Sequence, residues 1–132
     1  MYFENNKHKI FYEEKIEQVK NLDTYIKSLI YLISSNEDTR KHFEDIYDIK
    51  NNEINLYVFK APWQTNTSLN ITRLAFNLFG DLVTDDIEEG ASYLYSISSI
   101  FKNINLNTGI EAIKIRFDKK LCKQPNNYGL ID

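Results

Sequence analysis

The stretch DTYIKSLIYLIS, residues 23–34, decides how this chain folds. Asp23 is a good N-cap residue, and apolar side chains then follow on nearly every side of the predicted helix. These apolar residues are Tyr25, Ile26, Leu29, Ile30, Leu32 and Ile33. A helix that is apolar all round is buried in globular proteins. We therefore predict that residues 23–34 form the central helix of the core.

Amphipathic segments surround this helix. Apolar residues recur at helical spacing in residues 6–20, 37–47, 69–79 and 91–102, and in a last helix that begins at Asn107 or Thr108. In the last helix the repeating residues are Ile110, Ile113, Lys114 and Phe117. Asn5 or Asn6 can cap the first segment, and Thr67 or Ser68 can cap the segment that Gly80 ends.

Three stretches are less regular. Residues 49–55 have the composition of a loop with its tip at Asn51 and Asn52. Residues 56–59 are aromatic and β-branched, which favours a short strand or an extended strap over the helices. Residues 81–89 are an acidic connection in which a helix could begin at Thr84. The predicted fold is a mostly α, single compact domain over residues 1–132, with five or six helices, one short strap or small β element, and a frayed tail at 124–132.

The composition excludes several classes of protein. The chain has 132 residues, of which 42% are hydrophobic and 27% charged, and this is a globular balance. A net charge of −3 argues against general nucleic-acid binding, and no apolar run approaches the length of a membrane span. The single cysteine, Cys122, cannot form an internal disulfide. No secretory signal is visible at the start, so we expect a cytoplasmic protein without a membrane partner.

Few residues offer catalytic chemistry. The histidines are His8 and His42, and His42 stands three residues before Asp45, so these two side chains could share a helix face. No metal-binding motif accompanies them, and no glycine-rich phosphate loop is present. Cys122 lacks a base and an oxyanion site of its own. We therefore predict no catalytic residue, no metal and no cofactor, with a hydrolase based on His8 or His42 as the least supported alternative.

The charges are unevenly distributed. Acidic residues cluster at 37–53 and again at 81–89, whereas basic residues gather at 114–123. An acidic surface could dock on a basic groove of another protein. Ordinary solvation and matching to helix dipoles explain the same pattern, and we favour this second interpretation.

Residues 63–77 hold the best candidate binding site. They contain the only tryptophan, a run of amides and hydroxyls, and one of three arginines. Trp63, Gln64, Thr65, Asn70 and Arg73 could form a small polar pocket or a contact anchor. Alternatively, Trp63 plugs the domain while Gln64 and Thr65 cap the helix behind it, and this is the interpretation that we favour.

The same region carries a resemblance. The motifs that carry it are Trp63-Gln64-Thr65 and Ile71-Thr72-Arg73-Leu74-Ala75-Phe76-Asn77-Leu78. Further similar segments are His8, Phe11-Tyr12, Leu29-Ile30-Tyr31-Leu32 and Glu111-Ala112-Ile113-Lys114-Ile115-Arg116. Over most of its length the chain resembles a family of unknown function, made up of small proteins from low-GC Gram-positive bacteria and their phages. The resemblance implies a phage or mobile-element accessory protein, and it assigns no catalytic residue.

Two binding functions follow as expectations. The first is a non-catalytic protein that binds a host defence protein and inhibits it, in the manner of an anti-CRISPR protein. The second is a small-ligand binder that sequesters a nucleotide signal, with Trp63 stacking on the base and Arg73 binding phosphate. Neither expectation requires direct contact with nucleic acid.

Overall fold

The computed structural model describes residues 1–85 and 92–118, and this part of the chain is mostly helical. Its α-helices are α1 (Asn6–Ile16), α2 (Thr24–Ile33), α3 (Glu37–Lys41), α4 (Phe43–Ile46), α5 (Asn66–Gly80), α6 (Ile97–Ile100) and α7 (Leu106–Arg116). Two short strands, β1 (Tyr47–Asp48) and β2 (Glu53–Ile54), pair in an antiparallel hairpin. Two 3-10 helices, η1 (Leu56–Lys60) and η2 (Ser92–Tyr95), complete the fold. The predicted compact α domain with a small β element is confirmed.

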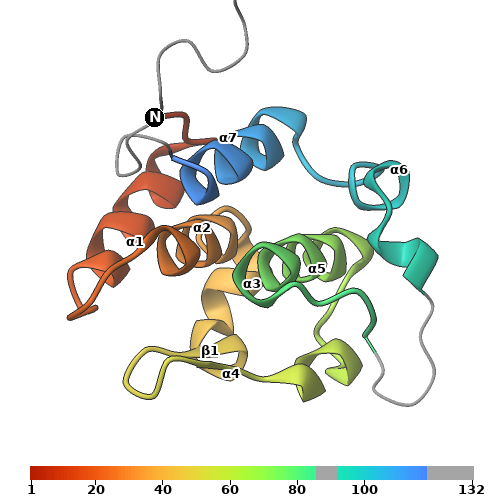
Figure 1. Ribbon diagram of the computed structural model, residues 1–132, viewed down its shortest axis with the longest axis horizontal. Coiled ribbons are helices and arrows are strands. Elements are labelled where there is room, and N and C mark those ends of the chain that lie inside the picture. The colour runs from red at the N-terminus through yellow and green to blue at the C-terminus, as the bar shows by residue number, and fades with distance from the viewer. Residues whose placement is uncertain (86–91, 119–132) are drawn as a thin grey trace, which may run out of the picture.

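Helix α2 is the centre of the molecule, as its sequence predicts. It packs against α5, α7 and α1, and Figure 1 shows it enclosed by these helices. The side chains from Leu29 to Ile33 are completely buried. The Asp23 Oδ1 atom accepts a hydrogen bond of 2.8 Å from the backbone N–H of Ile26, which confirms Asp23 as the cap.

Helix caps account for most boundaries. Asn5 caps α1, Asn36 caps α3 and Asn105 caps α7, each by accepting backbone N–H bonds through its side chain. Because α7 begins at Leu106, the predicted start of the last helix at Asn107 or Thr108 is one or two residues late. The predicted helix over 37–47 is broken at His42, which separates α3 from α4 and brings the number of α-helices among the described residues to seven.

The segment around the hairpin differs from the prediction. Residues 56–59, predicted as a strand or strap, belong to the 3-10 helix η1, because the Asn55 side chain accepts a hydrogen bond from the Tyr57 N–H and starts a tight turn. The strands lie just before it, with Tyr47 opposite Ile54. The predicted tip at Asn51 and Asn52 is correct, and Asn52 has a left-handed φ of 54°.

Residues 91–102 do not form the continuous helix that we predicted. The described part consists of η2 followed by the short α6, which Ser96 caps through its side chain. A helix beginning at Thr84 is likewise wrong for Thr84 and Asp85, which are not helical. The remainder of that acidic connection and the predicted tail at 124–132 lie outside the described residues. Within the described ranges, none of the helices combines the length and apolar character needed to cross a membrane.

In α1 and α7, some of the large apolar residues lie outside the buried face. In α1 the fully buried positions are His8 and Tyr12, while Ile10 is 54% exposed. In α7 the side facing the core carries Thr108, Gly109, Ala112 and Ile115. Small residues let α7 approach α2 closely, and Leu106, Ile110 and Ile113 are left on the opposite side.

Candidate functional site

Thr65 caps helix α5, and Gln64 contacts this cap through the Ser68 hydroxyl. The Thr65 Oγ1 atom accepts a hydrogen bond of 3.1 Å from the Ser68 N–H, and the Ser68 Oγ atom accepts one of 2.7 Å from the Thr65 N–H. The Ser68 hydroxyl also donates to the Gln64 side chain at 2.5 Å. This reciprocal capping box satisfies backbone donors that would otherwise be unpaired. The structure therefore gives Thr65 the capping role that we favoured from the sequence, whereas Gln64 binds the Ser68 hydroxyl and the Val58 carbonyl.

Trp63 is half-buried and packs against the edge of the core. Its indole lies flat on the imidazole of His42, with ring centroids 4.3 Å apart and planes 4° apart. His42 Nδ1 lies 3.0 Å from an Asp45 carboxylate oxygen, as their spacing suggested. The indole face that could stack on a nucleotide base is thus occupied by a side chain of the same protein.

Arg73 and Asn70 belong to a polar network that joins α5 to the segments around it. The Arg73 guanidinium binds the Asp85 carboxylate and also donates to Asn70 Oδ1 at 2.9 Å. Tyr95 donates to the same carboxylate at 2.6 Å, and burial together with Asp85 raises the pKa of the Tyr95 hydroxyl. Asn70 Nδ2 donates to the Ser99 carbonyl at 3.2 Å. Because each of these groups has a partner, the network stabilises the packing of α5, η2 and α6.

A small cleft of about 230 Å³ opens beside this network. The described residues that line it are Asn66, Asn70, Arg73, Tyr93, Leu94, Ser99, Lys102 and Asn103. Trp63 is not among them. Of the five residues predicted as one site, the structure brings Asn70 and Arg73 together and places Gln64 and Thr65 in a cap and Trp63 on His42.

His8 is completely buried, and both of its ring nitrogens are engaged. Nε2 lies 2.9 Å from the Tyr31 carbonyl oxygen, and Nδ1 accepts a hydrogen bond of 3.1 Å from the Glu4 N–H. Burial lowers the pKa of His8 to about 4, so the imidazole is neutral in the folded protein. This geometry suits a packing residue. In the described part of the chain, no three His, Cys, Asp or Glu side chains converge in a way that could hold a metal ion.

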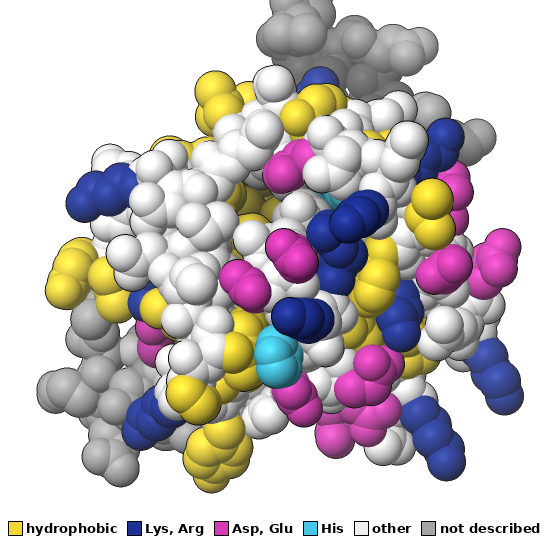
Figure 2. Space-filling model, turned by 180° about the vertical axis from the view of Figure 1, so that it is seen from behind, with side chains coloured by type: hydrophobic (Ala, Val, Ile, Leu, Met, Phe, Trp, Pro, Cys, Tyr) yellow, Lys and Arg dark blue, Asp and Glu magenta, His cyan; other side chains and the backbone are white. Residues whose placement is uncertain are grey.

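The acidic residues of 37–53 are engaged locally. Glu37 and Asp38 occupy the first turn of α3, where they complement the helix dipole, and Glu44 forms an ion pair with Lys15 at 3.2 Å. Asp48 accepts hydrogen bonds from Asn51. Figure 2 shows acidic and basic side chains interspersed on one side of the molecule. The arrangement agrees with the favoured interpretation of solvation and dipole matching.

A line of exposed apolar side chains lies on α7. Leu106, Ile110, Ile113 and Phe117 are 60%, 40%, 38% and 52% exposed, and their spacing of four, three and four residues places them in one line along the helix. We call these four residues the α7 face. The sequence showed the periodicity of Ile110, Ile113 and Phe117 but gave no sign that they point outward. A usable signal is the small side chains of Gly109 and Ala112, which mark the opposite side as the closely packed one.

Basic groups border the C-terminal end of the α7 face. Lys114 is exposed, and the Arg116 guanidinium lies 4.6 Å from the Phe117 ring centroid and 3.5 Å from that of Tyr25. The Arg116 Nε–H donates to the Leu78 carbonyl at 2.8 Å, which fixes the guanidinium in place. Tyr25 is 43% exposed and continues the apolar surface onto α2. This apolar surface with basic borders has the make-up of a protein-contact site.

These features define a small α-helical protein that exposes an apolar helix face and keeps its few polar clusters internally paired. The chain belongs to the family of unknown function DUF6075, whose model matches residues 1–129. No curated protein and no solved structure matches the chain.

Proposed function

We propose that this chain is a non-catalytic protein that acts by binding another protein through the α7 face. The observation that carries the proposal is the line of four exposed apolar side chains on a helix whose other side is packed against the core. Burying a large apolar side chain completely contributes about 1.5–3 kcal/mol. Because the four are about half exposed, covering them supplies on the order of 4 kcal/mol before the costs of association.

The chemistry of the α7 face indicates the kind of partner surface that fits. The spacing i, i+4, i+7, i+11 is that of a helix laid into an apolar groove. Lys114 and Arg116 border the face, and Lys119, Lys120 and Lys123 follow in the sequence. The complementary surface is therefore an apolar groove with an acidic rim, and salt should weaken the complex.

The biological role that we propose is inhibition of a host protein, specifically a component of a bacterial defence system. The support is the resemblance to small proteins of bacteria and their phages, together with a binding surface on a compact domain. The test is phage plating on cells that carry the defence system, with and without this chain. Expression should raise the plating efficiency, and an unchanged efficiency against every defence system tried contradicts this role.

The docking surface itself is tested by charge substitutions. Leu106→Glu combined with Ile110→Glu should preserve folding, because both positions face solvent and an acid in the first turn of α7 complements the helix dipole. The matched control is Ile97→Glu combined with Tyr57→Glu, which introduces the same two charges at residues that are 78% and 83% exposed. The three proteins serve as baits for affinity capture from host lysate, followed by mass spectrometry.

We expect the unchanged chain and the control to capture the same partner protein in similar amounts. The double variant should capture at least tenfold less of it. The same partner should bind the Lys114→Gln variant more weakly, and its binding should fall with added salt. Equal capture by all three baits contradicts the role of the α7 face. Size-exclusion chromatography tests self-association. If the unchanged chain is a dimer and the double variant is a monomer, the α7 face binds a second copy of the chain, and the proposal of a different partner protein is wrong.

A further inference from the structure

A second, separate surface feature lies at the opposite end of α2 from the cap of α3. It is a cleft of about 510 Å³ between the loop that follows α1 and the β1–β2 hairpin. This volume falls within the usual range for small-molecule sites. The residues that line it are Gln18, Val19, Lys20, Asn21, Ile26, Tyr47, Ile49, Lys50 and Asn52. None of them belongs to the α7 face.

The cleft has an apolar floor. Ile26 and Tyr47 are 5% and 1% exposed, and the half-buried Val19 and Ile49 pack against the same core. An apolar body placed here would lose contact with water and gain contact with side chains that are already fixed by core packing. The floor therefore favours a ligand with a hydrocarbon portion.

The hairpin wall of the cleft is held in one conformation. The Tyr47 hydroxyl donates to Asn52 Oδ1 at 2.6 Å, and this bond holds Asn52 in its left-handed conformation with φ 54°. Asn51 Nδ2 donates to the Asp48 carboxylate at 2.7 Å across the same turn. A wall that is already ordered costs little conformational entropy when a ligand binds.

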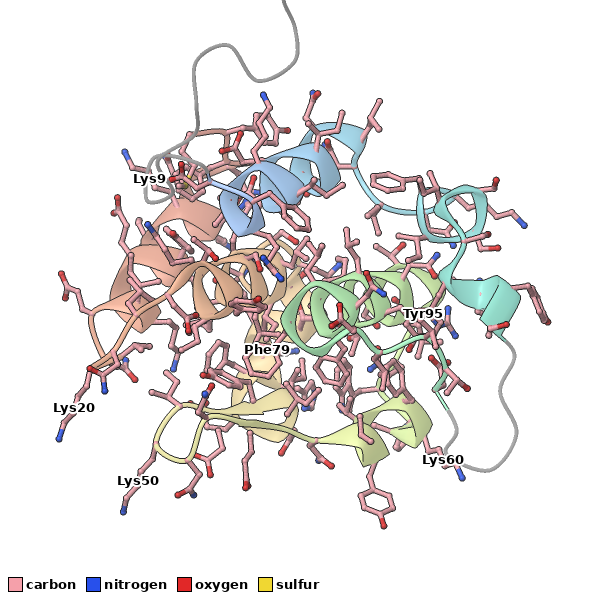
Figure 3. The ribbon with its side chains drawn as sticks, viewed as in Figure 1. Lys9, Lys20, Lys50, Lys60, Phe79 and Tyr95 are labelled. Atoms are coloured by element: carbon pink, nitrogen blue, oxygen red, sulfur yellow. The ribbon has the colours of Figure 1, made fainter. Side chains whose placement is uncertain are left out.

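The rim of the cleft is polar and basic. Lys20 and Lys50 extend from the two neighbouring loops at the same corner of the molecule (Figure 3), and Gln18, Asn21 and Asn52 also line the cleft. Among the described residues, no carboxylate lines the cleft. The carboxylates of Asp23 and Asp48 lie near enough to contribute to the raised pKa of the Tyr47 hydroxyl. Both are engaged elsewhere, because Asp23 caps α2 and Asp48 accepts a hydrogen bond from Asn51.

We propose that this cleft binds a small amphiphilic anion, whose apolar body covers Val19, Ile26, Tyr47 and Ile49 while its anionic head lies between Lys20 and Lys50. Ammonium groups bind carboxylates and phosphates as point charges, and the amides at the rim can donate further hydrogen bonds. The site shares no residue with the α7 face.

The test is titration of the ¹⁵N-labelled full chain with octanoate, followed through its amide chemical shifts. Octanol is the matched neutral probe, with the same hydrocarbon chain and no charge. We expect octanoate to shift the amides of residues 18–21 and 49–52 and to bind at least threefold more tightly than octanol. Lys20→Gln combined with Lys50→Gln should remove that difference, whereas Lys9→Gln combined with Lys60→Gln, at other corners of the molecule (Figure 3), should keep it.

Three results would overturn the proposal. One is an octanoate titration that moves no amide of the cleft, and another is octanol binding as tightly as octanoate. The third is an octanoate preference that survives the Lys20 and Lys50 substitutions. Val19→Phe provides a second variant that acts on the floor. It should fill the cleft and weaken both probes while leaving the circular dichroism spectrum unchanged, and undiminished binding of both probes would also contradict the proposed location.

Discussion

Arg73 binds Asp85 through two nitrogens. Nη2 lies 2.9 Å from Oδ2, and Nε lies 3.1 Å and 3.3 Å from the two carboxylate oxygens. The two side chains are only 11% and 22% exposed, and Tyr95 donates to the same carboxylate. This forked geometry is the strongest form of a protein ion pair, and it fastens the segment after α5 to the side of that helix.

Removing either partner of this ion pair should destabilise the fold. We expect Arg73→Gln or Asp85→Asn to lower the free energy of unfolding by about 1–3 kcal/mol, because the remaining charge is left partly buried without its partner. The double variant should lose clearly less than the sum of the two single losses. Urea unfolding followed by circular dichroism measures the free energy of unfolding of the unchanged chain, the two single variants and the double variant. Glu44→Gln, which removes a carboxylate that is 77% exposed, is the control and should cost less than about 1 kcal/mol. Strict additivity of the Arg73 and Asp85 losses would contradict the coupling.

Acid should destabilise the protein through His8. Burial lowers the native pKa of this residue from 6.5 to about 4, so the unfolded chain takes up the proton at a higher pH than the folded one. The stabilisation that neutral His8 provides is complete above pH 6.5. It is lost as the pH falls from 6.5 to about 4, and the loss amounts to about 3 kcal/mol.

Urea unfolding at a series of pH values measures this effect. His8→Gln should be less stable at neutral pH, because its side chain fits the site of the imidazole poorly, but its stability should vary little within that window. Asp48 contributes only at lower pH, because hydrogen bonds from Asn51 lower its pKa below the ordinary 3.8. A His8→Gln variant with an unaltered slope between pH 6.5 and 4 would show that another group is responsible.

Gly109 should resist replacement for a packing reason. A Cβ atom at this position would lie 2.6 Å from Cζ of Phe101, so the ring would have to move. Alanine is favoured over glycine in a helix by about 1 kcal/mol, and this gain should appear only when the ring is absent. We therefore expect Gly109→Ala to leave the thermal midpoint unchanged or lower it, and to raise it in a Phe101→Ala background. A rise in both backgrounds would mean that the ring moves aside without cost.

The stacked pair of Trp63 and His42 should be energetically coupled. Rings that are 4.3 Å apart and nearly parallel contribute about 0.5–1.5 kcal/mol beyond the area that they bury. A double-mutant cycle with Trp63→Ala and His42→Ala should recover a coupling of that size. The same cycle between His42 and the exposed Ile97 should give none. Because Trp63 is the only tryptophan, its fluorescence should also change when His42 is replaced. Zero coupling with unchanged emission would contradict the stack.

Local signals made the centre of the fold predictable. Asp23 and the unbroken apolar run behind it identify α2 as the central helix, and Asn5 was expected as the cap of α1. The start of α5 was predicted three residues late, because Thr65 caps this helix in place of Thr67 or Ser68. Gln64 and Thr65 were correctly interpreted as part of such a cap. These features depend on neighbours within four residues, so the sequence alone contains them.

Helix orientations and side-chain partners that depend on residues distant in the sequence could not be predicted. The orientation of α7 is set by the side that carries Thr108, Ala112 and Ile115, which is buried in the core. Leu106, Ile110 and Ile113 therefore face outward despite their apolar character. Residues 56–59 are an exception, because Asn55, the cap that makes them form η1, is their immediate neighbour in the sequence. Trp63 and Arg73 lie in one short segment of sequence, but in the structure Trp63 stacks on His42 and Arg73 pairs with Asp85. Local spacing therefore identified the capping residues and not the surface that we propose for binding.

Photo-crosslinking tests the central claim, docking through the α7 face, most directly. A benzophenone amino acid replaces Ile113 in one protein and, as the control, the 83% exposed Tyr57 in another. Both are irradiated in host lysate and resolved by mass. We predict a discrete adduct with one partner from position 113, absent when Leu106→Glu is added, and no such adduct from position 57. The same adduct from position 57, or an adduct at 113 that Leu106→Glu does not affect, would contradict the account.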